Sequence, residues 1–151
     1  MPGDCRNIYK IARRAAGLTQ EAAAERLGLS VESIRAYETG GRVPPSQVVE
    51  LMVILYNAQH LAYQHLHETN ELYNRIVPAL EDRDLIRTAV VLRNRLARME
   101  QRRSLDRLLE IAEDDRIDED ERPEFLAIVA ELREIVRSAL ELQLHCPAEE
   151  G

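Results

Sequence analysis

The feature that most constrains this chain is the stretch LTQEAAAERLGLSVESIRAYETG, which runs from residue 18 to residue 40. Thr19 is placed to cap the N-terminus of one short helix with its side-chain oxygen, and Ser30 is placed to cap a second. Between the two helices, Gly28 can adopt the left-handed conformation that ends a helix. Each helix has only about two turns and is marginal in isolation. The stretch therefore predicts a helix, a tight turn and a second helix, buried by neighbouring helices.

The same stretch resembles the helix-turn-helix of the lambda-repressor/Cro-like (XRE) family of DNA-binding proteins. The residues that carry the resemblance are Gly17-Leu18-Thr19-Gln20, Ala24, Leu27-Gly28, Ser30, Ile34, Glu38 and Gly40. The resemblance extends from about residue 7 to about residue 66. It implies a five-helix DNA-binding domain in residues 1–67. It also implies a transcriptional regulator that binds DNA half-sites about one helical turn apart as a symmetric dimer.

Apolar periodicity supports the remaining helices of this domain independently. We expect a first helix over 6–16, ended by Gly17, and a fourth over 47–57, capped by Ser46. A fifth is expected over 59–67. The expected inward-facing residues are Ile8, Ile11 and Ala15 or Ala16 in the first helix, Val48, Leu51, Met52 and Leu55 in the fourth, and Leu61, Tyr63 and Leu66 in the fifth.

Beyond residue 67 the composition changes, because residues 42–150 contain no glycine. Such a region is expected to be almost entirely helical, which makes the fold class all-α, with a small helical bundle in residues 68–151. Helices are expected over 71–77, from Leu85 onward and over 104–112, where Leu105, Leu108, Leu109 and Ala112 form the apolar stripe. A long final helix is expected after Asp118, which can form a capping box with Glu121.

Two helices of this region carry apolar seams. In the helix from Leu85, apolar residues recur at alternating spacings of four and three, as in a heptad repeat: Leu85, Ala89, Leu92, Leu96 and Met99. The final helix has one seam of Phe125, Ile128, Leu132, Ile135, Ala139 and Leu142, and a second of Leu126, Val129, Val136, Leu140 and Leu144. We expect the second seam to pack against another subunit and form a homodimer. The alternative is that it packs within the monomer against residues 71–100.

Charge is unevenly distributed along the chain. The net charge is −7, yet residues 1–67 hold seven Lys/Arg against six Asp/Glu, and residues 68–151 hold thirteen against twenty-one. The acidity therefore lies outside the DNA-binding half, where it would keep the C-terminal region away from phosphates.

The resemblance implies which residues contact DNA. Those expected to do so are Thr19, Gln20, Ser30, Val31, Glu32, Ser33, Arg35, Ala36 and Arg42. Gln20, in the first turn of its helix, would contact a phosphate with Thr19 and Arg42 beside it. The residues expected to face the major groove are Val31, Glu32, Ser33, Arg35 and Ala36. There Arg35 can pair with a guanine or a phosphate, and Val31 can contact a thymine methyl. Ser33 can hydrogen-bond to more than one base. Glu32 can accept from cytosine but repels phosphates.

The resemblance also implies an ion pair between Arg13 and Glu38, which would fix the angle of the second helix. This pair is structural, and neither residue is counted as a base contact.

No catalytic or metal site is expected, and the chain is not expected to be an enzyme or to need a cofactor. His60, His65 and His67 do not share one helical face, and the acidic run 114–121 lacks the glycine of a calcium loop. Cys5 and Cys146 are expected to be reduced thiols. There is neither a signal peptide nor a run of about 20 apolar residues, so we expect a soluble, cytoplasmic protein.

Together these features predict a sequence-specific transcriptional regulator, a dimeric repressor that occupies a palindromic operator and competes with polymerase. Two alternatives stay open. One is a protein-interaction adaptor with a degenerate helix-turn-helix, suggested by Glu32 and by the small Ala23. The other is an antitoxin whose C-terminal half binds a protein partner.

Overall fold

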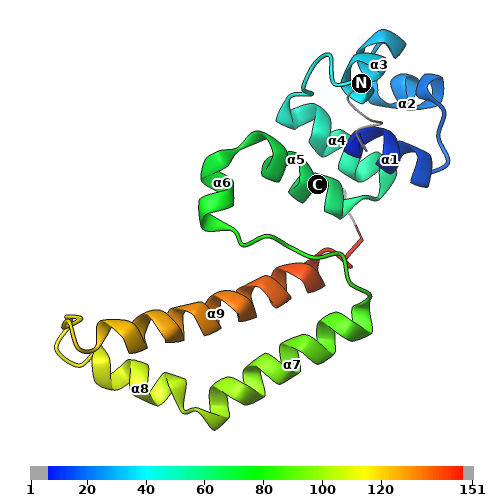
Figure 1. Cartoon of the computed structure of the whole chain (residues 1–151). Coiled ribbons are helices and arrows are strands. Elements are labelled where there is room, and N and C mark those ends of the chain that lie inside the picture. The colour runs from blue at the N-terminus through cyan, green and yellow to red at the C-terminus, as the bar shows by residue number, and fades with distance from the viewer. Residues whose placement is uncertain (1–6, 148–151) are drawn as a thin grey trace, which may run out of the picture. The chain divides into compact units, whose positions relative to one another are not determined.

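The computed structural model describes residues 7–147, which are all-α as predicted (Figure 1). The chain divides into two compact units. The first runs to Tyr73 and includes Cys146 and Pro147, and the second comprises Asn74–His145. Arg6, the expected start of the first helix, and Cys5 lie outside the described residues, whereas Cys146 is an exposed free thiol.

The first unit contains five helices around one core: α1 (Ile8–Ala15), α2 (Gln20–Leu27), α3 (Val31–Glu38), α4 (Ser46–Tyr56) and α5 (Gln59–Thr69). A sixth, α6 (Glu71–Ile76), crosses the division between the units. The side chains that close the core are apolar and come from all five helices: Ile8, Tyr9, Ala23, Ala24, Ile34, Tyr37, Val49, Met52, Val53, Tyr56 and Leu61. The short α2 and α3 are thus buried by their neighbours, as their length requires.

The predicted caps of the helix-turn-helix are confirmed. Thr19 Oγ1 accepts a hydrogen bond from the Ala22 amide, and Ser30 Oγ accepts one from the Ser33 amide, each at 3.1 Å. Gly28 ends α2 with φ +66°. Gly17 follows α1 with φ +72°, and Asn7 caps the start of that helix by accepting from the Lys10 amide.

The predicted inward faces of α1 and α4 are confirmed in part. Ile8 and Met52 are buried, and Ala16, Val48 and Leu55 pack against the core. In α1, however, Ile11 is half exposed, and Tyr9 and Arg13 are buried beside Ile8. In α4, Leu51 is half exposed while Val49 and Val53 are buried.

The Ser46 cap is also wrong, because α4 begins at Ser46 with Pro45 in the cap position. The Pro45 carbonyl accepts from the Val48 and Val49 amides, which starts the helix one residue early.

The second unit is a helical hairpin. The helices α7 (Leu85–Gln101) and α9 (Arg122–Gln143) run side by side in opposite directions, and α8 (Ser104–Ile111) lies at their connection (Figure 1). Its small core consists of Met99, Ile111 and Ile128, with Leu108, Phe125, Leu132 and Ile135 packed against it.

The apolar seam predicted for α7 is only partly covered. Met99 is buried in the hairpin core and Leu92 is half-buried, but Leu85 and Leu96 are 57% and 48% exposed. Thr88 is fully buried and Arg95 reaches α9. The stripe predicted for α8 is likewise covered only in part, since Leu108 packs against the core while Leu105 and Leu109 are exposed and Ile111 is buried. Both errors arise because spacing identifies an apolar stripe without showing what covers it.

The start of α9 differs from the predicted capping box. The helix begins at Arg122, and no side-chain hydrogen bond caps it. Half of the box is present, because the Glu121 carboxylate accepts from the Asp118 amide at 3.2 Å. The Asp118 carbonyl accepts from the Arg122 amide, so residues 118–121 form a turn before the helix.

The two seams of α9 have different surroundings. Ile128 is buried in the first seam, but its Ala139 is exposed. In the second seam Leu126, Val129 and Val136 are exposed, and Leu140 and Leu144 are half-buried. These three side chains therefore remain about half exposed in the described chain.

Over residues 7–147, none of the helices combines the length and apolarity needed to cross a membrane.

Candidate nucleic-acid interface

The outer surface of α3 presents the residues expected to face the major groove. Ser30, Glu32 and Arg35 are exposed, while Ser33 and Ala36 are half-buried. Ile34 and Tyr37, on the opposite face, belong to the core. Val31 is less exposed than a major-groove contact would require, because it is half-buried and packs against the core.

Arg42 is held against α3 although it lies in the following loop. Its Nη2 donates to Ser33 Oγ at 2.8 Å, and its guanidinium lies 4.9 Å from the centre of the Tyr37 ring. The Arg42 amide donates to the Ala36 carbonyl, which closes the loop onto the helix. Ser33 also accepts from the Ser30 hydroxyl at 3.0 Å. The side chains of Arg42, Ser33 and Ser30 are therefore linked along one edge of α3.

A buried ion pair fixes α3 against α1. Arg13 donates from Nε and Nη2 to the two carboxylate oxygens of Glu38, at 2.6 Å and 2.9 Å. Both side chains are buried, with 7% and 3% exposed. Arg13 Nη1 also donates to the Leu18 carbonyl at 2.6 Å. One guanidinium thus joins α1, the loop before α2 and the end of α3.

The Glu38 carboxyl stays ionised in this buried position. Burial alone would raise its pKa, but hydrogen bonds from Arg13 and Gln20 and the positive charge of Arg13 outweigh that effect and hold the pKa below its ordinary value. The charge is therefore paired inside the domain and is not offered to DNA.

Gln20 takes part in this buried network. Its Nε2 donates to Glu38 Oε2 at 2.9 Å, so the side chain is held towards the end of α3. The sequence pattern indicates a phosphate contact for Gln20 and gives no sign of this internal bond. Thr19 is exposed beside it, with its hydroxyl oxygen used as the cap of α2.

Asn7 is a positioning residue that the sequence pattern did not single out. Its Nδ2 donates to the Tyr37 carbonyl at 2.8 Å, while its Oδ1 accepts from the Lys10 amide. One side chain thus caps α1 and binds the last turn of α3. An asparagine immediately before an apolar helical pattern is the available signal, since it is a preferred N-cap.

The three histidines His60, His65 and His67 each contact a tyrosine. His65 Nδ1 is hydrogen-bonded to the Tyr9 hydroxyl at 2.8 Å, and the rings of His60 and His67 lie against Tyr63. Within residues 7–147 no three His, Cys, Asp or Glu side chains are grouped to hold a metal ion.

The geometry defines a class of domain. A capped helix that follows a glycine turn and is held by a buried ion pair is the arrangement of a helix-turn-helix domain, which is typical of DNA-binding regulators. Comparison with protein families supports the same class. Residues 10–66 match the family model described as a helix-turn-helix domain, and this segment is a helix-turn-helix domain. The match agrees with the resemblance to lambda-repressor/Cro-like regulators. Searches of curated proteins and of solved structures found no match.

Proposed function

We propose that this protein is a sequence-specific transcriptional repressor that binds a palindromic operator as a homodimer. The observation that carries the proposal is the presentation of α3. Its Glu32 and Arg35 side chains are exposed, while Ile34, Tyr37 and Glu38 anchor the helix in the domain. A helix anchored in this way can enter a major groove without reorganising.

The exposed residues have separate roles in this mechanism. Arg35 reads a guanine, because a guanidinium can donate two hydrogen bonds to the O6 and N7 acceptors of that base. Arg42 and Thr19 contact the phosphate backbone and set the position of α3. Glu32 repels phosphates and accepts from cytosine, so it lowers non-specific affinity and favours a cytosine.

Dimerisation follows from the small size of the surface that contacts DNA bases. One helix of eight residues, Val31–Glu38, reaches too few base pairs for tight specific binding. Two copies related by a two-fold axis place two such helices on half-sites about one helical turn apart. The exposed seam residues Leu126, Val129 and Val136 of the second unit supply apolar surface for this contact.

Repression is then a consequence of occupancy, since a protein bound at an operator competes with polymerase. The mechanism needs neither a catalytic group nor a cofactor. We place the protein in the cytoplasm, together with its DNA.

The proposal is tested by selecting bound sequences from a random duplex library at near-physiological salt. The mass of the protein in solution is measured alongside. The expected result is an enriched palindrome with half-sites about ten base pairs apart, bound by a dimer. Absence of enrichment, with binding that disappears at modest salt, would exclude a sequence-specific regulator and support a protein partner for the C-terminal region.

A further inference from the structure

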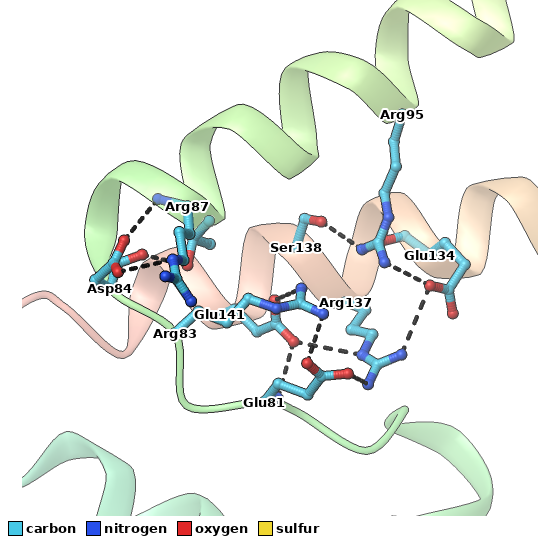
Figure 2. Close-up of polar contacts among 10 residues, drawn as sticks. Glu81, Arg83, Asp84, Arg87, Arg95, Glu134, Arg137, Ser138 and Glu141 are labelled. Carbon is cyan, nitrogen blue, oxygen red and sulfur yellow. Dashed lines mark hydrogen bonds and ion pairs between the residues drawn. The ribbon is translucent and has the colours of Figure 1, made fainter.

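The helical hairpin of the second unit has one polar face. Glu141 of α9 is only 1% exposed and accepts from the Glu81 amide at 2.9 Å and from Arg83 Nη1 at 3.1 Å. Glu81 in turn accepts from Arg137 Nη2 at 2.8 Å. Figure 2 shows these four side chains meeting where the segment before α7 crosses α9.

The polar contacts continue along the hairpin. Arg95 of α7 donates to Ser138 Oγ and to the Glu134 carboxylate (Figure 2). Further along, Arg98 and Arg102 of α7 and Glu131 and Glu134 of α9 line one shallow pocket. Because this pocket is shared by both helices, these residues lie on the same face of the hairpin.

The opposite face carries apolar side chains on both helices, with exposed Arg133 of α9 between two of them. With 100° between successive helical residues, Leu85, Ala89 and Leu96 of α7 lie on the side away from Arg98 and Arg102. By the same count, Val129 and Val136 of α9 lie on the side away from Glu131 and Glu134. We call this surface, made of Leu85, Ala89, Leu96, Val129 and Val136, the apolar hairpin face. These five residues are all exposed, Leu96 at 48% and Val136 at 49%.

The size of this surface follows from the dimensions of the two helices. At 1.5 Å per residue α7 is about 25 Å long, and two packed helices are about 20 Å wide. The whole face of the hairpin therefore measures on the order of 500 Å², and its apolar side chains cover part of it; the largest apolar patches on monomeric proteins measure about 300–600 Å² and are often functional. The spacing of its α7 residues is that of a seam between nearly aligned helices, which indicates a helical partner.

Two charged residues at the edge of this face indicate which helical partner fits. Arg93 and Glu100 are seven residues apart on α7, so they lie on one stripe beside Leu96. Neither forms an ion pair within the described part of the chain. A cation and an anion placed symmetrically about Leu96 are self-complementary when α7 meets an antiparallel copy of itself.

We propose that the apolar hairpin face binds a second copy of this chain, with each α7 antiparallel to its counterpart and Leu96 close to the two-fold axis. Arg93 of each copy then faces Glu100 of the other. Arg95 contacts Glu134, which puts Leu96 level with the segment of α9 between Val129 and Val136. The same axis therefore brings Val129 of one copy to Val136 of the other. The inference rests on the proposed homodimer but not on DNA binding, and it identifies the surface and register of the dimer.

The surface is tested with Leu96→Arg in the full chain, using sedimentation equilibrium for mass and circular dichroism for helicity. The expected result is a helical monomer at concentrations where the parent protein is a dimer. The matched control is Leu51→Arg, because Leu51 is a leucine of similar exposure, 50%, on α4. This control should remain a dimer. A parent protein that is monomeric at micromolar concentration, or a helical Leu96→Arg dimer, would overturn the proposal.

The register is tested by charge reversal, which introduces no bulky group at the seam. Arg93→Glu alone and Glu100→Arg alone should each weaken the dimer about tenfold, since each turns two attractive pairs into repulsive ones. The double variant should restore the parent dissociation constant to within about threefold. Independent losses that add in the double variant would exclude the antiparallel pairing. These measurements use no DNA, so failure of operator binding is separable from failure of the interface.

Discussion

Arg42 Nη2 donates a hydrogen bond to Ser33 Oγ at 2.8 Å across nine residues of sequence. The bond joins the loop after α3 to the first turn of that helix, and the guanidinium lies 4.9 Å from the centre of the Tyr37 ring. A charged side chain held in this way has already lost much of its rotational freedom. It can therefore bind a phosphate with a smaller entropic cost than a free arginine.

The first prediction concerns this arginine. Arg42→Ala should weaken binding to all DNA sequences to a similar extent, because a phosphate contact carries no sequence information. The slope of log affinity against log salt should fall by about one. Fluorescence anisotropy with the selected operator and with a scrambled duplex, each over a range of salt, measures both effects. A loss confined to the operator would contradict the assignment to phosphate.

Arg35 is the matched comparison, since it is another exposed arginine of the same surface. Arg35→Ala should cost about 1–3 kcal/mol of discrimination at one base pair and relax the preference there. Repeating the library selection with this variant identifies the base pair. If the preference is unchanged and all sequences bind more weakly, Arg35 contacts a phosphate instead.

The sequence was sufficient for those parts of the fold that depend on local chemistry. The caps at Thr19 and Ser30 and the left-handed Gly28 follow from side chains close in sequence, so their prediction needed no tertiary information. The bonds from Arg42 to Ser33 and from Gln20 to Glu38 depend instead on how a loop and two helices meet. No local pattern encodes that arrangement.

The helical hairpin illustrates a second limit. The heptad-like spacing identified an apolar stripe on α7, but only its last member, Met99, is buried in the core, while Leu85 and Leu96 are exposed. Thr88 is buried and Arg95 bonds to α9, and no hydrophobic pattern singles out either residue. Arg95 can face α9 because Ser138 and Glu134 satisfy its donors. Such pairing between distant helices is not visible in periodicity.

The ion pair between Arg13 and Glu38 gives a prediction about stability. Arg13→Met and Glu38→Met should each reduce the free energy of unfolding by about 3 kcal/mol, because each leaves a buried charge without its partner. The double variant should lose less than the sum of the two single losses, since no charge is then left unpaired. Urea unfolding followed by circular dichroism measures all three. Strictly additive losses would show that the two side chains do not stabilise one another.

Gly28 gives a prediction about backbone conformation. A Cβ at this position would meet nothing within 4 Å. The only cost of Gly28→Ala is therefore the free energy of holding an alanine in the left-handed conformation at φ +66°. The expected loss is about 1 kcal/mol in urea unfolding, with a smaller loss for Gly28→Asn. Gly41→Ala is the control, because its Cβ would lie at an ordinary 3.7 Å from the Ala36 carbonyl oxygen. Equal losses at the two positions would refute a conformational cause.

His65 gives a prediction about pH. The side chain is 6% exposed, and its hydrogen bond to the Tyr9 hydroxyl joins α5 to α1. Burial lowers the pKa of His65 from its ordinary 6.5, so the folded domain holds the imidazole neutral. Burial and the nearby charge of Glu68 raise the pKa of Tyr9 to about 12, so this hydroxyl stays protonated over the same range.

Because the unfolded chain binds a proton at His65 more readily than the folded chain, stability is full above pH 6.5 and falls as the pH drops below it. The urea midpoint should therefore decrease between pH 7.5 and pH 5.5, and His65→Gln should reduce that decrease. Tyr9→Phe is the control, since it removes the hydrogen bond at every pH, at a cost of about 1 kcal/mol, and leaves a buried histidine to titrate. If the decrease with pH is as large in His65→Gln as in the parent protein, proton uptake at His65 is not its cause.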